Sequence, residues 1–101
     1  MVDVISEPIF FEWDKGNLDK SLKKHGVTNE EAEEVFFDNK SLLTEDIKHS
    51  LTEKRYQILG TADSGKLLSV IFTIRRKKVR IISARIMNRK ERRFYEGRKE
   101  A

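Results

Sequence analysis

Residues 55–86 read RYQILGTADSGKLLSVIFTIRRKKVRIISARI, and this stretch decides the fold. Three runs in it, over 55–61, 67–74 and 79–86, are rich in the β-branched and aromatic residues that favour strands. Two short polar connections separate the runs, Asp63-Ser64-Gly65-Lys66 and Arg75-Arg76-Lys77-Lys78, and connections of this kind join neighbouring strands as hairpins. The stretch therefore predicts a three-stranded antiparallel meander.

The predicted sheet has one apolar and one polar face. In its first strand, polar Arg55 and Gln57 alternate with apolar neighbours such as Ile58. An apolar sheet face has to be covered by another layer of the fold. The polar face is expected to stay partly open and to bear Arg55, Gln57 and whichever of Arg80 or Arg85 points that way.

Two helices precede the sheet and are the natural cover for its apolar face. The first is predicted over roughly 15–25, after Asp14, with Gly26 placed as a left-handed C-terminal cap. The second begins at Thr28, which forms a capping-box pattern with Glu31.

Two further elements complete the expected fold. A short strand is predicted over 9–13, before the first helix. A third helix follows the sheet, where Asn88 and Glu91 repeat the capping-box pattern and Phe94 and Tyr95 are the large apolar residues. The predicted fold class is α+β: a small antiparallel sheet with two N-terminal helices and a C-terminal helix.

The 101 residues suffice for one domain, over 1–101, with a thin core. Hydrophobic and charged residues each make up 38%, and there is no cysteine, so disulfides and thiolate nucleophiles are excluded. The sequence shows neither a membrane span nor a signal peptide, and we expect a cytoplasmic protein. His25 and His49 lie far apart, and we expect no metal site and no cofactor.

The charge is divided unevenly along the chain. Residues 1–74 hold 9 Lys or Arg against 14 Asp or Glu, whereas residues 75–101 hold 12 against 3. A basic segment of this strength attracts polyanions, so nucleic acid is the expected class of partner. The alternative is a solvated helix surface beside a basic turn.

Cleavage of RNA by its own 2′-hydroxyl needs a base, an acid and cations around the developing phosphorane charge. Arg85 ends a predicted strand, and Arg55 begins a neighbouring one, so the two could clamp a phosphate. The alternative for Arg85 is an ion pair, with Glu91 as its partner, that closes the sheet onto the third helix.

Three further residues are candidates for proton transfer, and each has a structural alternative. His25 is either a catalyst or a C-terminal capping residue of the first helix, and His49 is by default a surface residue. Glu53 either acts as a base or pairs with Arg55, and Tyr95 is either an acid with a lowered pKa or a core residue. The residues expected to contact RNA are Lys24, Arg75, Arg76, Lys77, Lys78 and Arg80.

Several short motifs occur in series from Phe11 to Tyr95. They are Phe11-Glu12-Trp13-Asp14 with Asn17; Lys24-His25-Gly26-Val27; Glu31-Ala32 and Val35-Phe36 with Asp38; Asp46, His49, Glu53 and Arg55; and Ile82-Ser83-Ala84-Arg85 with Glu91 and Tyr95. In this order the chain resembles the BrnT family of bacterial type II toxins.

The resemblance implies a RelE-like fold and a ribonuclease that arrests translation. It also implies neutralisation by a cognate BrnA antitoxin with a ribbon-helix-helix DNA-binding domain, and binding of operator DNA only through the toxin-antitoxin complex. Two alternatives stay open: a noncatalytic nucleic-acid-binding module, and a protein-interaction module whose basic surface meets an acidic partner.

Overall fold

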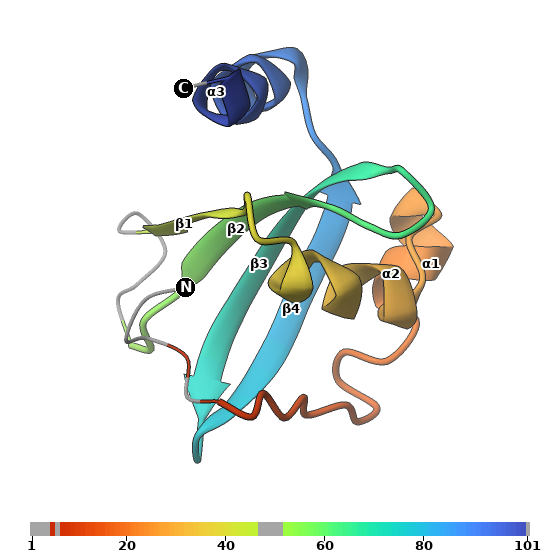
Figure 1. Ribbon diagram of the computed structural model, residues 1–101. Helices are drawn as coiled ribbons and strands as arrows, with labels where there is room; N and C mark the ends of the chain where they lie inside the picture. The colour runs from red at the N-terminus through yellow and green to blue at the C-terminus, as the bar shows by residue number, and fades with distance from the viewer. Residues whose placement is uncertain (1–4, 6, 47–51, 101) are drawn as a thin grey trace.

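The computed structural model describes residues 5, 7–46 and 52–100, with the backbone alone over 98–100. Its centre is a sheet of four antiparallel strands in the order β1 (Leu42–Glu45), β2 (Tyr56–Thr61), β3 (Leu67–Arg75) and β4 (Lys78–Ile86) (Figure 1). The three predicted strands and their antiparallel order are confirmed, with ends that differ by at most one residue. The α+β fold class is confirmed as well.

Two elements at the sheet edges differ from the sequence prediction. β1 was not predicted, because its four residues are too few to show an alternating pattern; it pairs with β2 from Leu42 opposite Leu59. The strand predicted over 9–13 is wrong: this segment forms one isolated parallel bridge, between Phe11 and Val79 of β4. The segment crosses the edge of β4 and follows it only briefly.

A bulge in β4 changes which side chains share a face of the sheet. Ile71 pairs with Ser83, whereas the next residue of β3, Phe72, pairs with Ile81, so that Ile82 is the extra residue. Such an extra residue shifts the alternation of side chains by one position. As a result Arg80 and Arg85, which are five positions apart, are placed by register on the same face.

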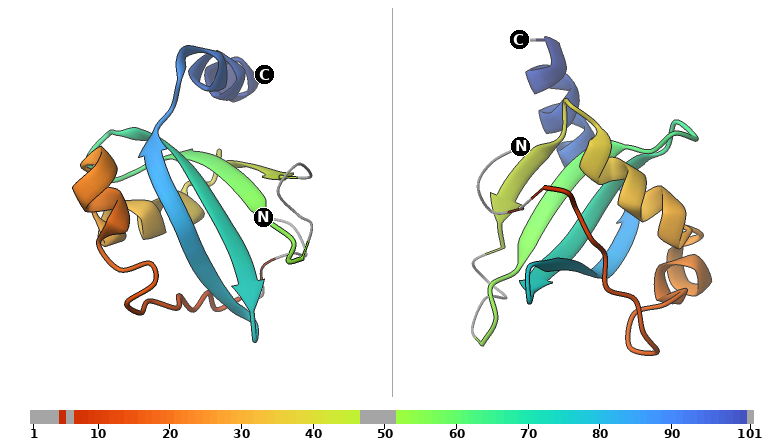
Figure 2. Two further views of the ribbon diagram at one scale, coloured as in Figure 1. Left: turned by 180° about the vertical axis from the view of Figure 1, so that it is seen from behind. Right: turned by 60° about the horizontal axis from the view of Figure 1, so that its bottom comes forward.

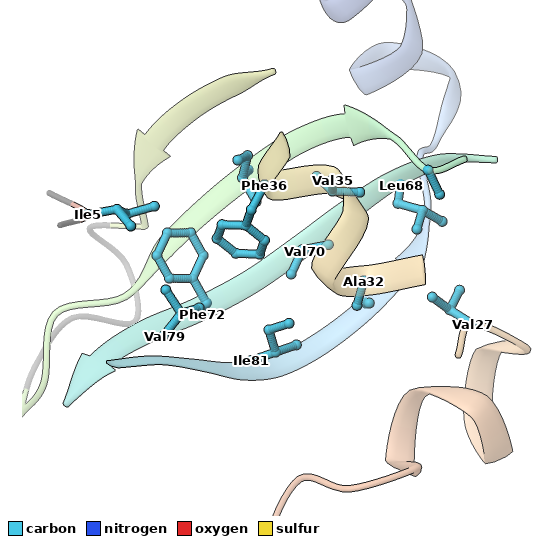
Figure 3. Close-up of a cluster of buried hydrophobic side chains, with 13 residues drawn as sticks. Ile5, Val27, Ala32, Val35, Phe36, Leu68, Val70, Phe72, Val79 and Ile81 are labelled. Carbon is cyan, nitrogen blue, oxygen red and sulfur yellow. The ribbon is translucent and has the colours of Figure 1, made fainter. Parts of the chain in front are cut away.

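The core lies on the other face of the sheet, under α2 (Asn29–Glu34) and η1 (Val35–Phe37). Figure 3 shows side chains of these two elements meeting those of β3 and β4 in one layer. The ring of Phe36 meets that of Phe72 edge-on, with their centroids 4.9 Å apart. Both rings are buried, so this contact helps hold η1 to the centre of the sheet.

α1 (Lys20–His25) does not cover the apolar face, contrary to the sequence prediction. It buries no residue, and Leu18 and Leu22 are 47% and 44% exposed. It also begins later than predicted, because the residues before it form turns, with the backbone N–H of Gly16 donating to Asp14 at 2.7 Å. The prediction failed because the apolar pair on this segment is too small to form a buried stripe.

The N-terminal segment and α1 instead cap the outer edge of β4. The Val79 N–H donates to the carbonyl of Phe10 at 2.8 Å, and the buried amide of Asn17 donates to the carbonyl of Ile81 at 3.0 Å. The Ala84 N–H donates to the hydroxyl of Ser21, also at 2.8 Å. An exposed strand edge invites pairing with another chain, and this edge is therefore protected.

The predicted caps and turns are confirmed. Gly26 ends α1 in the left-handed conformation, with φ of 71°, and Thr28 and Glu31 form a capping box at the start of α2. Arg76 and Lys77 both have positive φ, as a two-residue turn between β3 and β4 requires.

α3 (Arg89–Glu100) follows β4 and lies at the end of the sheet where β4 finishes (Figure 2). Its start has the predicted capping box: the Glu91 N–H donates to the Asn88 side chain at 2.8 Å, and the Asn88 N–H donates to the Glu91 carboxylate at 3.0 Å. The buried residue that ties α3 to the sheet is Tyr95, which clusters with Leu42, Leu59 and Met87.

Glu31 also links α2 to the β2–β3 connection. Its carboxylate accepts hydrogen bonds from the Thr28 backbone, the Ser64 hydroxyl and the Lys66 ammonium group. These donors, the Thr28 N–H first, lower the pKa of Glu31 from 4.5 to about 2, against the opposing effect of burial. The ionised carboxylate therefore stabilises the folded state.

We predict that Glu31→Gln lowers the free energy of unfolding at neutral pH and flattens its acid dependence. Because the folded pKa lies below the unfolded one, the contribution of Glu31 is present above about 4.5 and is lost as the pH falls toward about 2. Urea denaturation across this range measures the effect, with Glu30→Gln, at the exposed neighbouring position, as the matched control. Parallel pH profiles for wild type and Glu31→Gln would contradict the prediction.

Candidate functional site

The face of the sheet opposite the core, here called the open face, contains a pocket of about 430 Å³. All four strands or their immediate ends contribute to it. Its lining residues are Thr44, Glu45, Asp46, Arg55, Gln57, Ile71, Ile82, Ser83 and Arg85. The pocket, here called the open-face pocket, brings together Arg55 and Arg85, the two arginines that the sequence predicted as a phosphate clamp.

Arg85 is held in this pocket by Glu91 of α3. Its Nη1 and Nη2 donate to the two carboxylate oxygens of Glu91 at 2.7 and 2.9 Å, and Nη1 also donates to the Ile86 carbonyl at 3.2 Å. These bonds leave the Nε–H and one Nη2 hydrogen without a protein acceptor among the described residues. The ion pair foreseen as the alternative for Arg85 is therefore present, yet one edge of the guanidinium keeps two donors for an anion.

Glu91 is saturated with hydrogen bonds and positions Arg85 rather than transferring protons. Its carboxylate accepts two bonds from Arg85, one from the Asn88 N–H and one from the Gln57 amide at 2.9 Å. The hydrogen bonds from Arg85, followed by those from Asn88 and Gln57, lower the pKa of Glu91. A carboxylate with four donors and a lowered pKa is a poor general base.

Gln57 connects the ion pair of Arg85 and Glu91 to strand β3 of the sheet. The same amide nitrogen that donates to Glu91 also donates to the hydroxyl of Ser69, which is buried on β3, at 2.9 Å. The amide is thereby fixed in orientation between Ser69 and Glu91. We conclude that Gln57 helps hold the end of the pocket that Arg85 occupies.

Glu53 pairs with Arg75 and not with Arg55, which corrects the sequence prediction. The Nε and Nη2 atoms of Arg75 donate to the Glu53 carboxylate at 2.8 and 3.1 Å. The hydrogen bond from Arg75, and then the charges of Arg75, Arg55 and Arg80, lower the pKa of Glu53. Glu53 is not among the residues that line the open-face pocket.

Arg80 is tied to the N-terminal segment. Its guanidinium donates to Glu12 at 3.1 Å and to both carboxylate oxygens of Asp14 at 2.9 Å, and its side chain is mostly buried. The hydrogen bond to Asp14, followed by that to Glu12, raises the pKa of Arg80. Arg80 therefore anchors the segment that caps the β4 edge, although the sequence predicted it as an RNA contact.

The other predicted RNA contacts form two exposed groups. Arg75, Arg76, Lys77 and Lys78 are exposed around the β3–β4 turn. Lys24 is exposed in the last turn of α1, beside His25. Neither group lines the open-face pocket.

His25 is not brought to the open-face pocket. His25 is exposed in the last turn of α1, which lies beside β4, and it is not a lining residue of the pocket. His49 lies outside the described residues. Among the residues that the structure does describe, no group of three or more His, Asp or Glu side chains could hold a metal ion.

Tyr95 is a buried anchor, and its pKa is raised rather than lowered. Its hydroxyl donates to the carboxylate of Asp38 at 2.6 Å and shares a hydrogen bond with the Thr61 hydroxyl at 2.8 Å. Burial is the first cause of the raised pKa, and the hydrogen bond to Asp38 is the second. The sequence prediction of a Tyr95 acid with a lowered pKa is therefore wrong, because no arginine faces the phenol in these contacts.

Several polar residues that line the open-face pocket were not singled out as site residues from the sequence, among them Thr44, Glu45, Asp46 and Ser83. The first two belong to the unpredicted strand β1, and Asp46 follows it directly. Ser83 lies beside the bulge in β4, where alternation alone assigns the wrong face. Only the pairing of β1 with β2 brings the carboxylates of Glu45 and Asp46 to the arginines.

A small α+β fold with arginines in a pocket on an open sheet face fits the class of proteins that act on a phosphodiester backbone. The model of one sequence family matches residues 13–91, and its description is the ribonuclease toxin, BrnT, of type II toxin-antitoxin systems. The match spans most of the chain, so the chain belongs to the BrnT family, as the motif series predicted. A search of curated proteins found no match. Within the described residues, no helix combines the length and the apolar composition needed to cross a bilayer.

We predict that Tyr95→Phe destabilises the protein without reducing RNA cleavage by the folded fraction. The substitution leaves the partners of the buried hydroxyl, Asp38 and Thr61, short of one hydrogen bond each, which costs about 1–3 kcal/mol. Urea denaturation measures the stability, and a cleavage assay under folding conditions measures the activity. The control is Tyr56→Phe, since the Tyr56 ring stacks on Phe72 and its hydroxyl has no hydrogen bond among the described residues. A loss of cleavage in folded Tyr95→Phe would restore the acid role.

Proposed function

We propose that this chain is a metal-independent endoribonuclease that cleaves RNA in the open-face pocket. The observation that carries the proposal is Arg85: Glu91 holds its guanidinium rigidly, while two of its N–H donors remain for a phosphate. Arg55 lies in the same pocket and supplies a second cation. Two guanidinium groups in one pocket, one of them fixed by Glu91, match the charge that develops on a phosphodiester during cleavage.

In the proposed reaction the 2′-hydroxyl of the substrate attacks the adjacent phosphorus. The bond between O2′ and phosphorus forms, the bond between phosphorus and O5′ breaks, and the products are a 2′,3′-cyclic phosphate and a 5′-hydroxyl. Arg85 and Arg55 stabilise the added negative charge on the phosphoryl oxygens. We assign the removal of the 2′ proton to one of the two lining carboxylates, Glu45 or Asp46, and the leaving O5′ takes up a proton from solvent water.

Membership of the BrnT family supports the biological part of the proposal. We propose that the activity inhibits translation in the cytoplasm, and that a BrnA-type antitoxin with a ribbon-helix-helix domain neutralises it. Operator DNA is then bound through the antitoxin complex and not by this chain alone. The exposed cations at the β3–β4 turn support the approach of RNA by steering it toward the open face.

We predict that the wild-type protein cleaves RNA in the presence of EDTA and that Arg85→Ala reduces the cleavage rate about 100-fold or more. Removing one donor to the transition-state charge has an effect of this size in other enzymes. The rate is measured by gel electrophoresis of a labelled RNA, and the product ends identify the cyclic phosphate.

The matched control is Arg92→Ala, which removes an exposed arginine of α3 that does not line the open-face pocket. This variant should cleave at the wild-type rate. Equal losses in Arg85→Ala and Arg92→Ala would indicate a general electrostatic effect and contradict the proposed site. Binding that weakens with salt but yields no products from the wild type would instead identify a noncatalytic RNA-binding module.

A further inference from the structure

A second depression lies beside the open-face pocket, between α3 and the strands β1 and β2. Its volume is about 880 Å³, and its exposed surface is predominantly apolar. The floor is formed by Leu42 and Leu59, and the α3 side by Phe94 and Gly97. We call this depression the α3 groove.

The α3 groove is not filled by the described part of the chain. Phe94 lines it and is 60% exposed, although it is adjacent in sequence to the buried anchor Tyr95. A large aromatic side chain that lines an apolar depression and stays exposed marks a surface for a partner. The hydrogen bonds of the Tyr95 hydroxyl hold α3 in place, so the groove is formed before any partner arrives.

The charges around the groove specify the chemistry of its occupant. Lys90 and Arg93 line it, and neither forms an ion pair with any described residue. The one carboxylate that lines the groove, Glu91, is committed to Arg85. A segment that fits this surface therefore carries apolar side chains toward Leu42 and Leu59, and Asp or Glu toward Lys90 and Arg93.

These features favour a protein segment over RNA as the occupant. Single-stranded RNA is bound by successive aromatic side chains on which its bases stack. Phe94 is the aromatic residue of the groove lining, and its floor is aliphatic. Aliphatic side chains of a protein segment can pack against such a floor. RNA carries a charged phosphate at every nucleotide and does not pack against an aliphatic surface.

We propose that the α3 groove is the docking site of the antitoxin, through a segment with an apolar face flanked by carboxylates. This inference rests on the proposed function, which supplies the antitoxin as partner. The groove and the open-face pocket share Thr44 and Gln57 in their linings, and Glu91 connects them through Arg85. A segment docked in the groove thus covers the entrance to the pocket and blocks RNA.

The proposal is tested with the protein encoded by the reading frame next to the toxin gene, expressed together with the chain. We expect Phe94→Glu to weaken the affinity of the purified complex at least about tenfold, as measured by calorimetry. The substitution replaces an aromatic side chain that the antitoxin buries with a negative charge that repels the acidic residues of the docked segment. RNA cleavage by free Phe94→Glu should stay at the wild-type rate. The matched control is Phe37→Glu, since Phe37 of η1 is also exposed, at 66%, and lies outside the groove.

A second pair of variants tests the charge of the occupant. Arg93→Glu should weaken the complex, and the loss should shrink at high salt, because the effect is electrostatic. Lys23→Glu, at an exposed position of α1 away from the groove, should leave the affinity unchanged.

Four outcomes would overturn the docking site. Absence of a wild-type complex would also remove the proposed partner, while cleavage in EDTA would still stand as a separate result. A wild-type complex that Phe94→Glu does not weaken would overturn the docking site alone. If the free chain is a dimer and Phe94→Glu converts it to a monomer, the groove binds a second copy of the chain. If folded Phe94→Glu loses RNA cleavage, the groove binds RNA.

Discussion

The carboxylate of Glu91 joins three parts of the structure through four hydrogen bonds. It caps the start of α3 by accepting a hydrogen bond from the Asn88 N–H. It also accepts two hydrogen bonds from the guanidinium of Arg85 on β4 and one from the side-chain amide of Gln57 on β2. Because the same carboxylate makes all these hydrogen bonds, it fixes three features at once: the direction of α3, the orientation of Arg85, and the boundary between the open-face pocket and the α3 groove. A carboxylate so engaged has a lowered pKa and stays ionised at neutral pH.

The second constraint is the bulge that makes Ile82 the extra residue of β4. Without it, Arg80 and Arg85 would point to opposite faces of the sheet, and one of them would enter the core. With it, Arg85 reaches the open-face pocket, while Arg80 reaches the acidic residues of the N-terminal segment. The same feature thus protects the β4 edge and supplies the pocket with its cation.

Much of the local structure could be predicted from the sequence. The strand pattern of residues 55–86, the cap at Gly26 and the capping boxes at Thr28 and Asn88 depend on neighbours a few positions away, and the structure confirms them. The site was predicted in part: Arg55 and Arg85 do meet in one pocket, whereas Tyr95 is buried away from it. A tyrosine within a helix gives no sign in the sequence of whether its hydroxyl meets arginines or Asp38.

The sequence by itself determined the α+β class, the antiparallel meander and the family, because alternation, turn chemistry and motif order are local properties of the chain. Tertiary structure alone decided the partners of the charged side chains. For Arg85 it selected the pair with Glu91 that the sequence offered as one of two alternatives. It also gave Arg75 the partner Glu53, and the short strand β1 brought new carboxylates to the pocket. These pairings depend on a one-residue bulge and on strand edges far apart in sequence, and a shift of one residue reverses which face a side chain occupies.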